Sequence, residues 1–564
     1  MQPVVVIDPE APPDDTLAWA QYGAMQALTM LGISFRVATG QELRGAEEIP
    51  LLVMPAQGMT TRVWAAHLRD PERLGPTSDF LTVGGTVPVG GAVGSLPLFG
   101  PGDQVGAPYL LERRDDSLAC RLAPGLFATL GLYLSRFSWE GRPVKGGSFV
   151  QQIDALWDEH LAPRWGQVPV VDECLLLVEQ AFIVLYEDLR IPYVRKWPQP
   201  IRGGRICTHG LILTHDVDAT YEADQFRDPA AATASHLTDP DALQPLAQAQ
   251  NRWFNFRQWA DLETQLRVKS AFFLMSPDPA LEYWCSPGYN LADAPVAAAA
   301  WRLARLGWEV SIHQLGVDRQ ELLDGERRWF ERTMRTLPTG TRSHYLKHAP
   351  HTLALKAASG HAYDSTWYAE TTQSSFLCGT TRPFGPFGLA APGQPTRLWE
   401  FPFVAEDGIV FGVYGDAPRD TAGAIAEGGK VLAQALRHNG FVCLNAHQRT
   451  FARMGTYQGT PDDWTPAYEG LIRELQTSSP ALWTPLPREL AAWWSARERV
   501  ALDSRPKGLV VTNKGAAPIG DLVIVRPAGA AGGLWTDLVD GVGRRWFARA
   551  TGLLRPGETR VYPW

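Results

Sequence analysis

The chain has few cysteines and no paired cysteine motif. Its 564 residues include six cysteines, and no two of them form a C-x-x-C pair. This scatter favours reduced thiols and excludes a disulfide framework or a zinc knuckle. Residues 1–119 contain no cysteine at all, so a thiol nucleophile is excluded from the N-terminal part of the chain.

Long apolar runs and an excess of positive charge are also missing. No uninterrupted apolar stretch reaches the length of about 18 residues that a spanning helix needs, so we expect no membrane span. The N-terminal sequence MQPVVVIDPEAPPDD has no basic region and no apolar core of a signal peptide, which predicts a cytoplasmic protein. Sixty Asp and Glu outnumber 52 Lys and Arg, for a net charge of -8, so we expect no nucleic-acid partner.

Strand and helix patterns divide the chain into four segments. Residues 1–150 alternate short apolar runs with an amphipathic stretch, which predicts a non-catalytic, flavodoxin-like α/β domain. Residues 151–204 predict a helical connector that ends in a Pro/Gly-rich linker. Residues 205–495 again alternate strands and helices, and residues 505–564 predict a small β-sandwich of short strands between Gly/Pro turns.

Polar side chains follow the strands predicted in the third segment. LILT runs into His215, Asp216 and Asp218, WEVSI is followed by His313, and FVCLNA by His447. Since the carboxyl ends of parallel strands share one edge of a sheet, we expect these side chains to lie together. Two buried carboxylates this close repel unless a positive charge lies between them. The alternative is a polar turn in which one carboxylate caps the next helix.

A divalent cation, most simply Zn²⁺, would relieve this repulsion. Catalytic zinc takes imidazole and carboxylate ligands and keeps one position for water. Asp218, His313 and one further histidine fit this requirement. Asp216 can then remove a proton from the water as it attacks a carbonyl, and His447 can protonate the leaving amine.

Six motifs occur in order along this segment: LILTHDVD, SAFFL, GWEVSIH, GTRSHYLKH, YDSTW and LWEFPF. In order and spacing they resemble the metal-dependent polysaccharide deacetylases of carbohydrate esterase family 4. The similarity is greatest to a bacterial subgroup with T-H-D-V-D as first motif and R-x-H-Y-L as third. It covers about residues 205–450. The resemblance implies a distorted (β/α)7 barrel that removes an N-acetyl group, or a similar acyl group, from an amino-sugar glycan or its precursor.

The resemblance also implies roles for single residues. Asp216 matches the general base, and Arg342 matches the arginine that orients it. Asp218 and His313 match metal ligands, and His447 matches the acid. The predicted substrate-binding residues are the aromatic wall Trp367 and the two residues beside the motif centres, His215 and Tyr345.

Two positions depart from the family pattern. The second motif reads HQLGV from His313 onward and lacks the second histidine of the family. We expect His344, in the third motif, to replace that ligand; the alternative is a packed histidine that holds the loop. Asn445 stands two residues before His447, where the family has Leu, so the pocket for the leaving acyl group is expected to differ.

Three functions compete. The first is a metal-dependent carbohydrate N-deacetylase with a glycan or amino-sugar substrate. The second is a glycosyltransferase that holds a diphosphate through a cation on Asp216-Val217-Asp218, but that class does not need His313, Arg342 and His447 at later strand ends. The third is an inactive glycan-binding scaffold, which would not need a base, its orienting arginine and an acid together. The sequence therefore favours the deacetylase.

Overall fold

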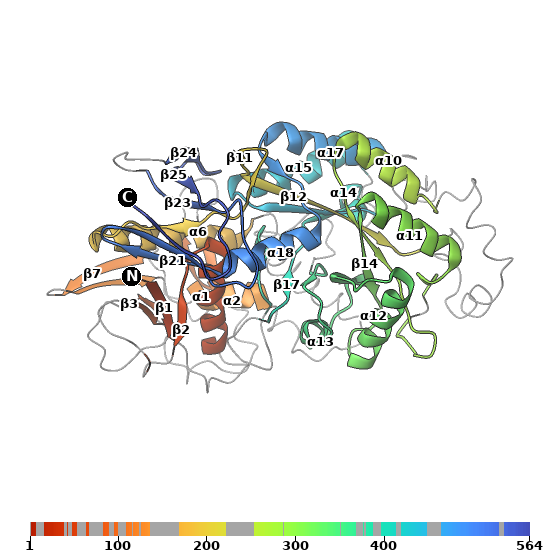
Figure 1. Cartoon of the computed structure of the whole chain (residues 1–564), viewed down its shortest axis with the longest axis horizontal. Coiled ribbons are helices and arrows are strands. Elements are labelled where there is room, and N and C mark those ends of the chain that lie inside the picture. Colours follow the sequence, from red (N-terminus) through yellow and green to blue (C-terminus); the bar gives the residue numbers. More distant parts are fainter. Residues whose placement is uncertain are drawn as a thin grey trace.

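The computed structural model places the N- and C-terminal elements together at one end of an elongated molecule and the central α/β part at the other (Figure 1). It describes residues 2–6, 16–38, 42, 48–52, 64–66, 83–88, 95–99, 109–114, 117–122, 126–135, 168–220, 253–285, 287–349, 351–367, 376, 379–386, 396–412, 419–447, 464–528 and 535–564.

The N-terminal part contains a six-stranded sheet in the order β2-β1-β3-β4-β8-β7, in which all neighbours are parallel except β7 and β8. Its strands are β1 (Gln2–Val6), β2 (Arg36–Ala38), β3 (Glu48–Leu52), β4 (Trp64–Ala66), β7 (Tyr109–Arg114) and β8 (Ser117–Leu122). A separate antiparallel pair is formed by β5 (Val83–Pro88) and β6 (Ser95–Phe99). The helices are α1 (Thr16–Leu31), α2 (Leu126–Ser135) and α6 (Val170–Asp188). The flavodoxin-like assignment remains a prediction.

The central sheet is parallel throughout, in the order β17-β16-β15-β14-β13-β12-β19-β18, and β20 pairs with the start of β12. Only residues 401–404 join β17 at one edge to β18 at the other, so the two edges lie within about 18 Å of each other. The sheet must therefore curl, which confirms the expected α/β class with a barrel-like parallel sheet. Its strands are β12 (His209–Val217), β13 (Ala271–Leu274), β14 (Glu309–Gln314), β15 (Gly340–Ser343), β16 (Tyr363–Asp364), β17 (Trp399–Glu400), β18 (Ala405–Glu406), β19 (Phe441–Asn445) and β20 (Leu482–Trp483).

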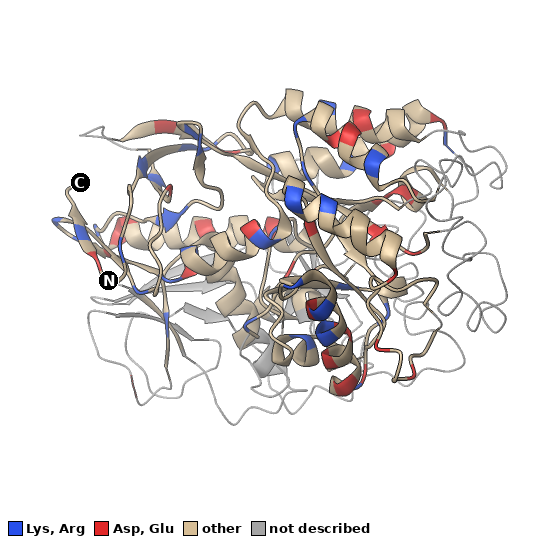
Figure 2. Cartoon of the chain, turned by 45° about the vertical axis from the view of Figure 1, so that its right-hand side comes forward, with Lys and Arg blue, Asp and Glu red and all other residues tan. Residues whose placement is uncertain are grey.

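Helices lie between most of these strands along the chain, as is usual for parallel pairing. They are α10 (Phe256–Leu266), α11 (Ala294–Leu306), α12 (Gln320–Met334), the short 3-10 turn η6 (His344–Leu346), α13 (Thr352–Ala358), α14 (Asp407–Val410), α15 (Thr421–Arg437), α17 (Thr465–Ser478) and α18 (Pro487–Glu498). Acidic and basic residues are interspersed along some of the described helices, such as α12 and α17 (Figure 2). Among the described residues, no helix is both long and apolar enough to cross a membrane.

Alternation along the buried strands decides which side chains face the inside of the curl. In β12, Leu211 and Leu213 pack in the core cluster formed with α10, α11, α12, α15 and α17, whereas Ile212 packs in a different cluster on the other face. Because successive residues of a strand point to opposite faces, Thr214 and Asp216 follow Ile212 to the inner face. His215 follows Leu213 to the helix side.

The C-terminal part contains two antiparallel sheets, in the orders β21-β22-β26 and β24-β25-β23-β9. Their strands are β9 (Arg195–Lys196), β21 (Val500–Arg505), β22 (Gly508–Asn513), β23 (Val523–Pro527), β24 (Thr536–Val539), β25 (Arg545–Ala550) and β26 (Thr559–Tyr562). The connector also forms a small pair, β10 (Ile201–Arg202) with β11 (Arg205–Ile206). The second of these sheets thus includes a strand of the connector, and the β-sandwich assignment for residues 505–564 remains a prediction.

Candidate metal centre and active site

Three side chains converge at the carboxyl end of the curled sheet. Asp218 follows β12, His313 lies on β14, and His344 begins the turn after β15. Asp218 Oδ1 is 3.0 Å from His313 Nε2 and 3.2 Å from His344 Nδ1, and the two imidazole nitrogens are 3.0 Å apart. Their ligand atoms are close enough to hold one metal ion.

The donor chemistry of this group fits a divalent cation. His313 Nδ1 lies 3.2 Å from the carbonyl oxygen of Arg342, which can only accept, so Nδ1 carries the hydrogen. In the neutral ring, Nε2 then presents its lone pair to Asp218. Ligand atoms about 2.1 Å from a tetrahedral Zn²⁺ lie about 3.4 Å from one another, slightly farther apart than the 3.0–3.2 Å found here.

The protonation states of the group also suit a metal. Burial alone would raise the pKa of Asp218, but the imidazoles of His447, His313 and His344 beside it hold it well below its ordinary value. Burial lowers the pKa of His344, although Asp218 opposes this shift. An ionised carboxylate and a neutral imidazole are the forms that bind metal ions.

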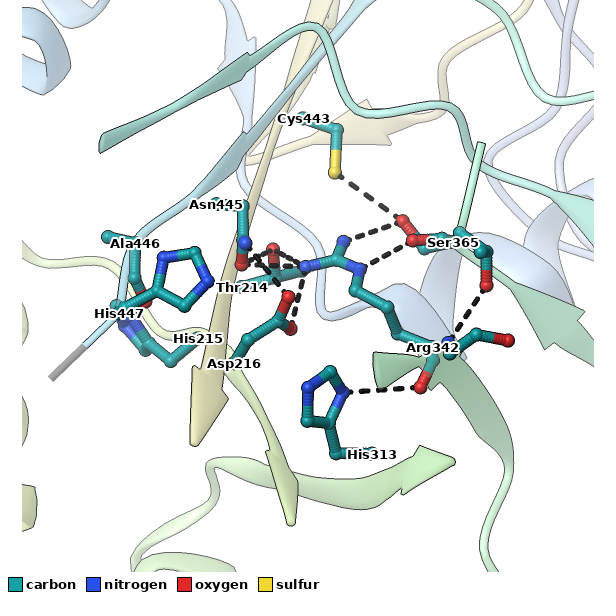
Figure 3. A network of polar contacts seen from close by, with 12 residues as sticks. Thr214, His215, Asp216, His313, Arg342, Ser365, Cys443, Asn445, Ala446 and His447 are labelled. Atoms are coloured by element: carbon teal, nitrogen blue, oxygen red, sulfur yellow. Dashed lines mark hydrogen bonds and ion pairs between the residues drawn. The ribbon is translucent and has the colours of Figure 1, made fainter. Parts of the chain in front are cut away.

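The second carboxylate of the motif, Asp216, is fixed from both of its oxygens (Figure 3). Arg342 Nη1 donates to Asp216 Oδ1 at 3.0 Å, and Asn445 Nδ2 donates to Asp216 Oδ2 at 2.9 Å. Arg342 Nη1 also lies 2.9 Å from Thr214 Oγ1 and 2.6 Å from Asn445 Oδ1. From the sequence, Asn445 was expected to affect only the acyl pocket. In the structure it also helps to position Asp216.

Arg342 is itself held rigidly, with no exposed surface. Its guanidinium donates to the carbonyl oxygen and the hydroxyl of Ser365 and lies between the rings of Phe273 and Phe403, 4.7 and 4.4 Å from their centroids. A guanidinium with so many partners cannot swing away. Arg342 thus fixes the orientation of Asp216.

His447 lies on the other side of Asp218 and has a carboxylate partner that sequence reasoning missed. Its Nε2 is 3.6 Å from Asp218 Oδ2. Its Nδ1 is 2.7 Å from Asp407 Oδ1, and its backbone N–H donates to Asp407 Oδ2 at 2.9 Å. The signal for Asp407 was its position directly after β18, the same strand-end placement that pointed to the other residues.

The three predicted substrate-binding residues lie in different surroundings. His215 is buried on the helix side, with both ring nitrogens hydrogen-bonded within the protein. Trp367 is 1% exposed and packs in the core against Phe384. Tyr345 is 63% exposed, and its ring centroid lies 4.2 Å from that of His344. Of these three residues, only Tyr345 is exposed, and it lies beside the Asp218–His313–His344 group.

Fold and site thus define an α/β protein whose curled parallel sheet carries an Asp–His–His group of metal-binding type. No protein-family model and no curated protein matches the chain. A protein assigned as a polysaccharide deacetylase from Mycobacterium smegmatis is similar to it over 53% of this chain and 94% of its own, at 19% identity and a TM-score of 0.38. A PuuE allantoinase is similar over 52% of this chain and 92% of its own, at 12% identity and a TM-score of 0.36. A family 4 acetyl xylan esterase from Clostridium thermocellum, in complex with a cobalt ion, is similar over 50% of this chain and 90% of its own, at 11% identity and a TM-score of 0.25.

Proposed function

We propose that the protein is a metal-dependent hydrolase that removes an N-acetyl or similar acyl group from an amino sugar in a glycan or its precursor. The observation that carries this proposal is the placement of three units at one end of the curled sheet. They are the Asp218–His313–His344 group, the base Asp216 held by Arg342, and the pair of His447 with Asp407.

The chain's own groups supply each proton transfer. A bound divalent cation would polarise the acyl carbonyl and make a water molecule more acidic. Asp216, oriented by Arg342 and Asn445, takes a proton from that water while the water oxygen forms a bond to the acyl carbon. His447, held at Nδ1 by Asp407, delivers a proton from Nε2 to the sugar nitrogen as the C–N bond breaks. The products are a carboxylate and a free amine.

The choice of substrate is supported by the sequence motifs, and the choice of metal by the ligands. Two imidazoles and one carboxylate favour zinc over magnesium or calcium, which prefer oxygen ligands. The glycosyltransferase alternative requires Asp216 and Asp218 to share a cation. Both oxygens of Asp216 already accept hydrogen bonds from Arg342 and Asn445, which disfavours that alternative.

The first experiment is metal analysis by elemental mass spectrometry on protein purified without chelator or added metal. We expect about one zinc or similar ion per chain. Asp218→Ala and His344→Ala should lose it, because each removes one of three ligands. His351→Ala is the matched control, since His351 is exposed and its Nε2 lies 2.9 Å from the carbonyl oxygen of Asp318.

Acetate release from N-acetylated chito-oligosaccharides would then test the reaction. No metal in the parent, and none recovered after zinc or cobalt is added back, would contradict the proposal. Metal that persists in both ligand variants would contradict the assigned site.

A further inference from the structure

His215 lies between the strand of the two carboxylates and the segment that leads into His447. Its Nδ1 is 3.0 Å from the carbonyl oxygen of Ala446, and its Nε2 is 2.7 Å from Glu263 Oε1 (Figure 3 shows the contact with Ala446). Its ring centroid is 3.9 Å from that of Trp259. Since a carbonyl oxygen can only accept, Nδ1 must donate to Ala446.

Glu263 is a buried anchor for this histidine. Its side chain has no exposed surface and accepts from Ser270 Oγ at 2.9 Å, Trp308 Nε1 at 2.6 Å and Tyr468 OH at 3.1 Å. These donors come from segments before β13, before β14 and on α17. The position of Nε2 is therefore tied to several separate elements.

The bond to Ala446 extends the pairing of two strands beyond the end of β19. The ladder between β12 and β19 ends with Thr214 opposite Asn445. One residue further, the Ala446 N–H donates to Thr214 O at 3.0 Å, and the Ala446 carbonyl accepts from the His215 side chain. The His215 side chain thus supplies the hydrogen bond to Ala446 O that a backbone N–H of β12 would supply if the ladder continued.

We infer that His215 is a positioning residue that fixes the backbone before His447 and so sets the distance of that imidazole from Asp218. His447 is held by its own bonds to Asp407 and by the strand extension at Ala446. The 3.6 Å separation of His447 Nε2 from Asp218 Oδ2 depends on both. The catalytic consequence of this inference rests on the proposed function; the structural part does not.

Two amide substitutions separate the two bonds of His215. The amide nitrogen of Asn can occupy the place of Nδ1, and that of Gln the place of Nε2. His215→Asn can therefore keep the bond to Ala446 and lose the one to Glu263, whereas His215→Gln does the reverse. Both lose the ring that packs against Trp259 at a tilt, so they are matched in that respect.

Hydrogen–deuterium exchange of the peptide over residues 441–447, read by mass spectrometry, tests the positioning directly. We expect faster exchange at Ala446 and His447 in His215→Gln than in His215→Asn or the parent. We also expect kcat of His215→Gln to be about tenfold below that of His215→Asn, with metal content equal in both. Tyr468→Phe, which removes one donor to Glu263 but leaves the Ala446 bond, should keep the slow exchange.

Equal exchange in the two variants, or faster exchange in His215→Asn, overturns the inference. If His215→Gln does not fold, the remaining variants still decide: fast exchange at Ala446 in His215→Asn would overturn it, and parent-like exchange would support it. If the parent hydrolyses no glycan while the exchange contrast holds, the proposed function fails and the positioning of the His447 segment stands.

Discussion

Asp216 and Asp218 are two positions apart in the chain but meet different partners. Asp218 faces two imidazoles and is 21% exposed at its side chain, whereas Asp216 is buried against Arg342 and Asn445. A positively charged guanidinium and an amide keep Asp216 in place without occupying it as a ligand. At the scale of single residues, the site therefore divides binding and proton transfer between the two carboxylates.

This division predicts opposite outcomes for two equivalent changes. Asp218→Asn should lose metal, because an amide is a poor replacement for an anionic ligand. Asp216→Asn should keep metal and lower turnover by about 10²-fold or more, because an amide cannot take up the proton. Metal analysis and acetate release on the two proteins check this. Equal metal in both variants would show that the roles are not divided in this way.

Asp407 supports a second prediction at this scale. Its carboxylate accepts from both Nδ1 and the backbone N–H of His447. In Asp407→Asn the amide can offer a donor where Nδ1 needs an acceptor, which favours the wrong tautomer. We expect kcat to fall by about 10- to 100-fold with bound metal retained. The measurement is kcat with metal content on the same sample, and a loss of metal would instead place Asp407 among the ligands.

At the scale of elements, the second motif lacks the second histidine of the family pattern. The loop that connects β14 to α12 at this point is held by a buried glutamate. Glu326 on α12 accepts from the N–H groups of Leu315 and Gly316 at 2.7 and 3.1 Å. A Cβ on Gly316 would lie 2.7 Å from that of Leu322, so the loop packs tightly on the helix. The loop after His313 is thus held by backbone contacts, and the third side chain of the metal-binding-type group, His344, follows β15.

Glu326 gives this element a pH dependence. Burial raises its pKa from an ordinary value near 4.5 to about 8, although its hydrogen bonds oppose the shift. Between these values the folded state binds more protons than the unfolded state, so the free energy of unfolding falls as the pH rises. Glu326→Gln should flatten this decrease. Urea unfolding from about pH 5 to pH 8 measures it, and parallel curves for parent and variant would refute the assignment.

The elements show what the sequence could predict. Buried parallel strands are continuous apolar runs, so β12, β13, β14 and β19 were recognisable, and the polar residues after them met at one edge as expected. His215 is different. Its position between Leu213 and Val217 on the helix-facing side follows from alternation, but its partner Glu263 lies on a helix 48 positions away. Such contacts depend on tertiary packing that no local pattern encodes.

At the scale of the whole molecule, one of the three apolar clusters of the described residues joins the predicted segments. A single apolar cluster includes Leu28 of α1, Leu130 of α2, Phe182 of α6, and Val525 and Trp546 of the C-terminal strands. Composition and turns suggested four separate units, because they report local boundaries. The strand β9, which carries the connector into the C-terminal sheet, could not be predicted from its two residues.

Arg497 on α18 tests whether this shared core unfolds as one unit. Its buried guanidinium donates to the carbonyl oxygens of Thr29 on α1 and of Lys196 and Trp197 in the connector. Arg497→Met leaves these buried acceptors short of a donor. We expect the free energy of unfolding to fall by about 3 kcal/mol.

The expected signature is a single transition that moves to lower denaturant when followed by both tryptophan fluorescence and far-UV circular dichroism. Arg473→Met is the control, because the Arg473 side chain is more than half exposed and forms an exposed i,i+4 pair with Glu469. It should change stability by less than about 0.5 kcal/mol. Two transitions, of which only one responds to Arg497→Met, would mean that the N-terminal helices and the curled sheet unfold separately, despite the donor that links them.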